Sequence, residues 1–188
     1  MSLLSHDELV ELINSGVLDA PVSAVNAASI DLTLAPTIMA ERPPRHGEIV
    51  SALDISRGAV LPMEYRRMHE YGGEAYYDLM PGEFILASTV ETFNLPNWVS
   101  SEYMQKSSLA RNALEHLAAG WCDAGWHGSN LTLELVNVSR YYPIRLRPGM
   151  PIGQMKFLRH KPVTDKDSYA SRGQYNGDSG VTQTKVLR

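Results

Sequence analysis

The sequence predicts a mainly β protein, built as a β-sandwich or a barrel-like jelly roll with few helices. Its clearest strand is NLTLELVN, residues 130–137, in which leucine occupies every second position. Successive side chains of a strand point to opposite faces, so the three leucines face one layer while Thr132, Glu134 and Val136 face the other. Short apolar segments recur elsewhere along the chain, and Pro-Gly pairs mark turns between them.

One helix is predicted close to the N-terminus. Ser5 and Glu8 have the spacing of a capping box, in which each residue satisfies a free backbone N–H of the first turn. Apolar residues follow with helical spacing until Gly16. Further strands are predicted at residues 30–34, 84–87, 144–146 and 152–158.

The chain is predicted to form a single domain, residues 1–188, because its length suits one core and it contains no internal repeat. Residues 40–49 are polar and rich in proline, which is typical of a loop. Residues 161–188 carry charges, glycines and serines with almost no apolar period. They form either a disordered end or a flap that a ligand orders.

Composition argues against several classes of protein. The net charge of -4 gives no basic surface for a phosphate backbone, so nucleic acid is not an expected partner. The single cysteine, Cys122, excludes an intramolecular disulfide framework and a multi-cysteine zinc site. No apolar run approaches the roughly 20 residues of a membrane helix, and no signal-peptide pattern is present. We therefore expect a soluble, cytoplasmic protein without membrane contact.

The segment KSSLAR gathers cationic and hydroxyl groups ahead of an apolar run. Ser107 or Ser108 is a candidate N-cap of a short helix that continues to Leu114. Lys106 and Arg111 would then join the free N–H groups of the helix start in binding a phosphate. Alternatively the serine only caps the helix and the cations are solvated, which the spacing alone favours.

Two carboxylates are candidates for catalysis. If the non-leucine face of its strand lines a pocket or a subunit interface, burial raises the pKa of Glu134 and makes it a proton shuttle. If that face is exposed, the side chain has no special role. Asp123 is either a turn residue that bonds its own backbone or a group that binds a sugar hydroxyl or activates water. His116 and His127 stand apart from other metal-ligand types and are expected to be structural or surface residues.

Six segments, in this order, resemble the motifs of the dCTP deaminase family, within the trimeric dUTPase-like enzymes. They are AASIDLTL (27–34), PGEFILASTVE (81–91), SSLAR (107–111), AGWCD (119–123), TLEL (132–135) and RPGM (147–150). The SSLAR signature matches without change. The resemblance implies a dUTPase-type fold, a distorted jelly roll or β-barrel-like structure. It also implies hydrolytic deamination of dCTP to dUTP and ammonia.

The resemblance further implies roles for particular residues. Glu134 would take a proton from a water held by Ser107 and the Ala119 carbonyl, and Arg111 would orient the water and the carboxylate. The implied nucleotide-binding residues are Lys106, Ser108, Asp123, Thr132, Leu133, Tyr169, Gln174 and Asp178. No residue is expected to bind metal directly, because Mg²⁺ would arrive on the triphosphate. No zinc is expected, which agrees with the lack of the zinc-deaminase motifs H-x-E and P-C-x-x-C.

The family also implies an assembly. Its members form homotrimers with active sites between subunits, which would place the Glu134 face of its strand at an interface. Its C-terminal flap closes over the triphosphate, and residues 161–188 resemble that flap. A segment that excludes water in this way suits a flexible, glycine-bearing sequence.

The tail departs from the family pattern at two positions. Gln174 stands where the family usually has lysine, and Asp178 where it usually has glutamine, so the tail is less cationic there. These changes raise the hypothesis that phosphate binding or base choice differs from that of the family, with a modified cytosine or another phosphorylation state as an alternative substrate to dCTP.

Three other functions remain open. A bifunctional enzyme would also release pyrophosphate and give dUMP, with Asp123 as the base for attack on the α-phosphate. A dUTPase-like enzyme would have no use for Glu134. A nucleotide-binding regulator would bind without turnover.

Overall fold

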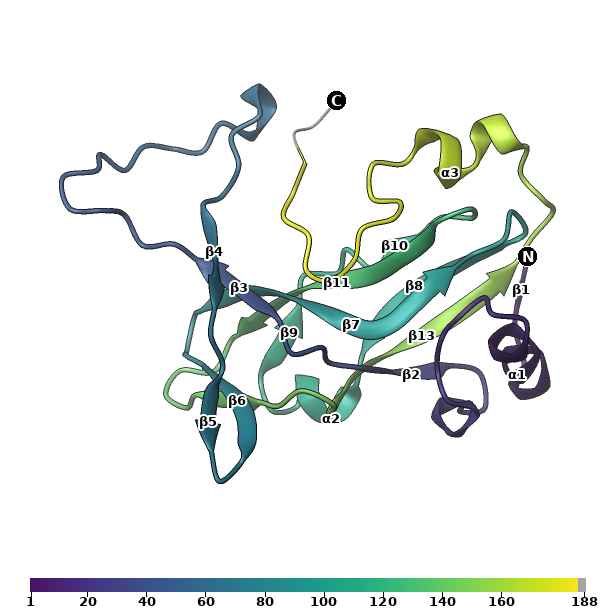
Figure 1. Ribbon diagram of the computed structural model, residues 1–188, viewed down its shortest axis with the longest axis horizontal. Helices are drawn as coiled ribbons and strands as arrows, with labels where there is room; N and C mark the ends of the chain where they lie inside the picture. The colour runs from purple at the N-terminus through teal and green to yellow at the C-terminus, as the bar shows by residue number, and fades with distance from the viewer. Residues whose placement is uncertain (186–188) are drawn as a thin grey trace.

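The computed structural model describes residues 1–185 and consists mainly of antiparallel β-strands (Figure 1). One five-stranded sheet has the order β1 (Ser2–Leu3), β13 (Pro151–Arg159), β8 (Val99–Gln105) and β10 (Trp121–Cys122), with β2 (Ile30–Thr33) also paired to β13. The second has the order β4 (Met63–Arg66), β3 (Ile38–Glu41), β7 (Phe84–Asn94), β11 (His127–Asn137) and β9 (Leu114–His116). A small third sheet contains β12 (Ile144–Leu146), β6 (Glu74–Leu79) and β5 (His69–Tyr71). The prediction of a mainly β fold with few short helices is confirmed.

The two larger sheets share one hydrophobic core. Phe157 of β13 and Leu133 of β11 both belong to it, and both are fully buried. Leucines and isoleucines from both sheets supply most of the remaining core side chains, as the alternating pattern requires.

The N-terminal helix α1 (His6–Asn14) begins as the sequence predicts. The backbone N–H of Ser5 donates to Glu8 Oε2 over 2.9 Å, which confirms the capping box. Leu9 and Leu12 are buried on its inner face, and Arg159 of β13 forms an ion pair with Glu8 at 3.0 Å. No helix within residues 1–185 is long and apolar enough to cross a bilayer.

β11 shows the alternation that the sequence predicts. Its leucines are buried in the core, whereas Thr132, Glu134 and Val136 on the other face are half-buried. The strand is paired on both sides, with β7 and with β9. Because a shift of one residue in pairing would turn every side chain to the opposite face, the buried leucines fix which side chains face outward.

The helix predicted after Lys106 is wrong in its extent. α2 covers only Ser107–Ala110, and Lys106, rather than a serine, occupies the N-cap position without a side-chain capping bond. Ala113 has a left-handed backbone conformation, φ +64°, and the chain then enters β9 at Leu114. A helix of one turn has no macrodipole of consequence, so the phosphate site expected at its start lacks that support.

Other differences concern short or irregular segments. The predicted loop at 40–49 begins only at Arg42, because Ala40 and Glu41 complete β3. The short strands β4, β5, β6, β9 and β10, and β8 as well, were not predicted, because their apolar residues do not alternate clearly enough to be recognised.

The C-terminal segment, residues 161–185, folds back across the second sheet (Figure 1). It contains α3 (Tyr169–Arg172) and then runs beside β11. Asn130 Oδ1 accepts a hydrogen bond from the Gly180 N–H, and Thr132 Oγ1 accepts one from the Thr182 N–H. Flap motion of residues 161–188 stays a prediction, and residues 186–188 lie outside the described part of the chain.

Replacing Ser5 by alanine removes the side chain of the capping box. We expect Ser5→Ala to lower the free energy of unfolding by about 1 kcal/mol, because a free N–H at the start of α1 loses its partner. Urea unfolding followed by circular dichroism measures the change. Ser51→Ala, in an exposed loop, is the control and should shift stability by less than about 0.5 kcal/mol. Equal effects of both substitutions would contradict the prediction.

Candidate active site

A pocket of about 580 Å³ lies between the outward face of β11 and the C-terminal segment. The strands β7 and β11 and the turn before β11 contribute Phe84, Leu86, Trp126, Asn130, Leu131, Thr132 and Glu134. Leu61, just before β4, and Met63, the first residue of β4, also line the pocket. β10 contributes Trp121 and Cys122, and the residues on either side of it contribute Ala119 and Asp123. The C-terminal segment contributes Tyr169, Tyr175, Asp178, Thr182, Gln183 and Thr184.

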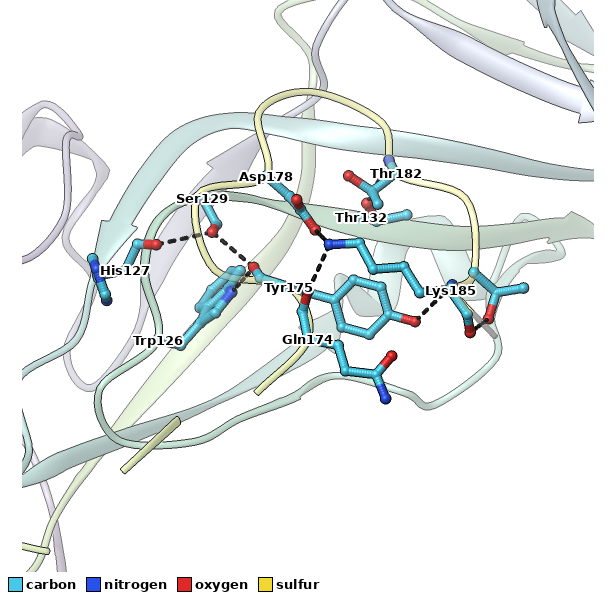
Figure 2. Close-up of polar contacts among 10 residues, drawn as sticks. Trp126, His127, Ser129, Thr132, Gln174, Tyr175, Asp178, Thr182 and Lys185 are labelled. Atoms are coloured by element: carbon cyan, nitrogen blue, oxygen red, sulfur yellow. Dashed lines mark hydrogen bonds and ion pairs between the residues drawn. The ribbon is translucent and has the colours of Figure 1, made fainter. Parts of the chain in front are cut away.

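Trp126 joins the apolar wall of the pocket to the C-terminal segment. Its ring stacks on Phe93 with 5.1 Å between centroids, and its indole N–H donates to the Tyr175 carbonyl over 2.9 Å (Figure 2). Ser129 Oγ donates to the same carbonyl over 2.9 Å. An aromatic, mostly apolar wall with a few fixed polar groups suits a planar heterocyclic ligand.

Glu134 projects from the non-core face of β11 into this pocket and meets a buried histidine. Its Oε2 lies 3.2 Å from His116 Nε2, and the His116 side chain is 4% exposed against 27% for Glu134. Neither atom makes a hydrogen bond of acceptable geometry with another described group. An unsatisfied carboxylate oxygen and ring nitrogen, both buried at the edge of a pocket, are available to bind and move a proton.

His116 is the functional candidate that the sequence analysis missed. It lies on β9, where it pairs with Leu135 of β11, and its ring is 4.5 Å from that of Tyr103. Burial and the charge of Glu134 together raise the pKa of Tyr103, which therefore stays a neutral neighbour. No local pattern could have identified His116, because its contact with Glu134 depends on the pairing of two strands.

A strained turn brings Ala119 to the pocket wall. Ala118 has a left-handed backbone conformation, φ +56°, which costs free energy for a residue with a Cβ atom. The turn is tied to β11, since the Leu117 N–H donates to the Glu134 carbonyl over 3.1 Å. Ala119 and Glu134 both line the pocket.

Asp123 and Tyr169 also line the pocket. Asp123 Oδ1 accepts a hydrogen bond from the Trp121 indole over 2.7 Å, so its carboxylate is fixed by a neighbour two residues away. Burial raises the pKa of Tyr169, which keeps its hydroxyl protonated as a donor. The structure thus brings together Glu134, Asp123 and Tyr169 with Ala119, Thr132 and Asp178, all of them predicted site residues.

Six predicted site residues do not line this pocket. Ser107, Ser108 and Arg111 are exposed on or beside α2, at the opposite edge of the molecule from the C-terminal segment (Figure 1). Lys106 forms an ion pair with Asp31 at 2.6 Å. The remaining two are Leu133 and Gln174.

Leu133 needs a correction. Its side chain is fully buried in the core, on the face of β11 opposite to Thr132 and Glu134, so only its backbone could meet a ligand. The Gln174 carbonyl accepts a hydrogen bond from Lys185, and its side chain is not part of the pocket wall. The pocket formed by a single chain therefore contains the carboxylates and the apolar wall, but not the hydroxyl groups and the guanidinium of the SSLAR segment.

Comparison with known proteins agrees with the motifs. A family model described as dCTP deaminase-like matches residues 3–160. The "dCTP deaminase, dUMP-forming" of Aquifex aeolicus (strain VF5) is 35% identical over 187 residues, which cover 98% of this chain and 94% of the relative. The "dCTP deaminase" of Haloarcula marismortui is 34% identical over 191 residues, with the same coverage of 98% and 94%. The chain belongs to the dCTP deaminase-like family.

A solved structure of the family shares this fold. The crystal structure of 2'-deoxycytidine 5'-triphosphate deaminase from Agrobacterium tumefaciens matches with a TM-score of 0.59 at 22% identity. The match covers 82% of this chain and 48% of that chain, so this protein spans about half the length of that structure. At this identity the likeness demonstrates the common fold alone.

Cys122 offers a test of how well this part of the dCTP deaminase-like domain excludes water. Burial raises the pKa of its thiol to about 12, so at pH 8 only about one thiol in ten thousand is ionised. We expect iodoacetamide to label the native protein at least about a hundredfold more slowly than the urea-unfolded chain, as measured by mass spectrometry. An exposed cysteine introduced as Ser51→Cys in a Cys122→Ser background is the control. Equal labelling rates for native and unfolded protein would contradict a buried thiol.

Proposed function

We propose that this protein removes the 4-amino group of dCTP by hydrolysis. The observation that carries the proposal is the position of Glu134. Its carboxylate faces a pocket of about 580 Å³ from the non-core side of β11, with a buried histidine nitrogen 3.2 Å away. The apolar wall beside it suits a pyrimidine ring. Relatives named dCTP deaminase, aligned over 98% of the chain, support the same activity.

In this proposal Glu134 acts as the general base and then as the general acid. It takes a proton from a water molecule as the water oxygen bonds to C4 of cytosine, which gives a tetrahedral centre. It then returns the proton to the amino nitrogen as the C4–N bond breaks. The proton that remains on the C4 hydroxyl moves to N3, so the products are the 4-oxo pyrimidine and ammonia, and no electrons are exchanged with a cofactor. The Ala119 carbonyl, on the adjacent wall, would accept a hydrogen bond from the attacking water.

His116 would position the Glu134 carboxylate during these proton transfers. The ring is 5% exposed and is packed against Tyr103, so its orientation is fixed by the core rather than by solvent. A ring nitrogen fixed 3.2 Å from the carboxylate limits the positions that the carboxylate can take. His116 would therefore act as a positioning residue for Glu134 and would not touch the substrate.

We propose that the complete site forms between subunits of a homotrimer. The support is geometric: the exposed SSLAR hydroxyls and Arg111 do not line the pocket that contains Glu134. A neighbouring subunit would supply Ser107 and Arg111 to the water, and Lys106 and Ser108 to the phosphates. A cyclic arrangement of identical chains repeats the same contact at every interface, which makes all sites equivalent.

Magnesium would enter this site on the nucleotide. The pocket contains the carboxylates of Asp123 and Asp178, and Mg²⁺ usually combines one or two carboxylates with phosphate oxygens and water. Residues 1–185 contain no group of three or more His, Cys, Asp or Glu side chains arranged to hold a metal ion. When bound, the ion would reduce the negative charge of the triphosphate.

We place this activity in the cytoplasm, where a buried free thiol such as that of Cys122 remains reduced.

A second candidate is a bifunctional enzyme that continues to dUMP. Several relatives, among them that of Nocardioides sp. (strain ATCC BAA-499 / JS614), carry the name "dCTP deaminase, dUMP-forming". In that case Asp123, fixed by the Trp121 indole and facing the pocket, would activate a water for attack on the α-phosphate. Product analysis separates the two candidates, since only the second releases pyrophosphate.

Replacing Glu134 by glutamine removes the base but keeps its shape. We expect Glu134→Gln to lower the kcat for ammonia release from dCTP at least about a hundredfold, with little change in dCTP binding. Ammonia is measured by a coupled assay, and dUTP, dUMP and pyrophosphate by chromatography. Glu70→Gln, on exposed β5, is the matched control and should leave kcat unchanged.

The same assay decides among the other functions. Ammonia release by Glu134→Gln at the wild-type rate would rule out the proposed base. Wild-type protein that converts dUTP to dUMP but releases no ammonia from dCTP is a dUTPase. Wild-type protein that binds dCTP without any turnover is a regulator or acts on a modified cytosine.

Mixed trimers test the shared site. Arg111→Ala and Glu134→Gln chains are each expected to be inactive, but a mixture refolded together recovers sites that combine an intact Arg111 with an intact Glu134. With equal amounts of both chains, random assembly restores about one quarter of the wild-type sites. The kcat per chain, compared with that of each variant refolded alone, measures the recovery. No recovery in trimers shown to contain both chains would mean that each chain forms its own site.

A further inference from the structure

The pocket wall has an imbalance of charge. Within residues 1–185 it contains the carboxylates of Glu134, Asp123 and Asp178, but no lysine, arginine or histidine. A nucleoside triphosphate brings about four further negative charges into this space. Like charges at short range raise the free energy of binding, so a pocket for this ligand requires a cation at its edge.

Lys185 is a cation that the C-terminal segment brings to this edge. Its Nζ lies 2.6 Å from Asp178 Oδ2 and 2.5 Å from the Gln174 carbonyl oxygen, to both of which it donates (Figure 2). It also lies 5.0 Å from the centre of the Tyr175 ring, within range of a cation–π contact. Asp178, Tyr175 and the neighbouring Thr184 all line the pocket.

Several contacts hold the segment that carries Lys185. Val181 is 7% exposed and packs with Met39 and Leu86 of the second sheet. The Thr182 N–H donates to Thr132 Oγ1 over 3.1 Å, and Gln183 Nε2 donates to the Leu61 carbonyl over 2.6 Å. The segment that precedes Lys185 is thus held by contacts with two residues of the pocket wall, Thr132 and Leu61.

An ammonium group has three donors, and two of those of Lys185 are engaged by Asp178 and Gln174. Its side chain is 41% exposed, so the group can still be reached from solvent. We propose that Lys185 is a phosphate-binding residue of this site, positioned by Asp178, and that it determines the preference for a triphosphate over less phosphorylated nucleotides. This inference rests on the proposed function, because it assigns the phosphate end of the same ligand.

The pairing explains why an aspartate can stand in a triphosphate pocket. Alone, Asp178 would repel the phosphates. Paired with Lys185, its charge is neutralised and the ammonium is held with a free donor. Loss of the lysine then leaves three carboxylates facing the ligand, and the penalty grows with the charge of the ligand.

Lys185→Gln tests the proposal because glutamine keeps a polar chain but removes the charge. We expect the Kd for dCTP, measured calorimetrically in the Glu134→Gln background with Mg²⁺, to rise about tenfold, and that for dCMP to change less than about twofold. In otherwise wild-type protein, the KM for dCTP rises by a similar factor while kcat changes less than about threefold. Lys185→Arg, which keeps the charge, should restore most of the affinity.

Two further variants isolate the roles of charge and position. Lys166→Gln removes an exposed lysine from the same C-terminal segment and should leave both dissociation constants unchanged. Asp178→Asn should weaken dCTP binding less than Lys185→Gln does. The double variant should bind no worse than Lys185→Gln alone, because the two residues act as one unit.

Two outcomes overturn the proposal. If Lys185→Gln loses affinity for dCTP and dCMP equally, Lys185 only stabilises the position of the C-terminal segment. If it loses affinity for neither, Lys185 does not bind the ligand. Inorganic tripolyphosphate separates this inference from the proposed function. Weaker tripolyphosphate binding by Lys185→Gln supports the lysine even if wild-type protein releases no ammonia from dCTP. An unchanged tripolyphosphate Kd overturns it even if the protein is an active deaminase.

Discussion

The arrangement of the site depends on the two faces of β11. Its leucines pack into the core, while Thr132 and Glu134, on the opposite face, line the pocket. The core face fixes the register, because a slip of one residue would expose three leucines and bury a carboxylate. Pairing on both edges then determines the neighbours of Glu134: β9 brings His116, and β7 brings part of the apolar wall. The packing of the core thus determines, through this one strand, where the proposed base Glu134 lies.

The features that the sequence predicts correctly are those set by local physical rules. The alternation of β11 and the Ser5–Glu8 capping box depend on residues within a few positions of one another, and both occur as predicted. The extent of α2 was wrong because Ala113 adopts a left-handed conformation that ends the helical path, and alanine gives no local warning of it. The position of Leu133 in the core also followed from the alternation, although the family resemblance suggested a contact with the ligand.

The features that could not be predicted are contacts between distant segments. His116 and Glu134 are 18 positions apart and meet only because β9 pairs with β11. Asp123 could be a turn residue or a site residue on its sequence alone, and its place in the pocket wall depends on the path of the chain between β10 and β11. The tail gave no periodic signal because it is held by isolated anchors, such as Val181 and the Thr182 N–H, rather than by a repeated face.

The charged residues of the site are divided between the β-sheet part of the molecule and the C-terminal segment. β11 contributes the carboxylate of Glu134, and the turn after β10 contributes that of Asp123; both carboxylates repel phosphates. The C-terminal segment contributes the ammonium group of Lys185 together with its partner Asp178. In the proposed reaction, proton transfer would depend on residues held by the β-sheets, and recognition of the phosphates on the C-terminal segment. A ligand that engages the lysine stabilises the segment over the pocket by the free energy of that contact. A covered pocket excludes water, and electrostatic interactions within it become stronger. If Lys185 binds the phosphates as proposed, the C-terminal segment would couple recognition of the phosphates to the exclusion of water from the proposed base.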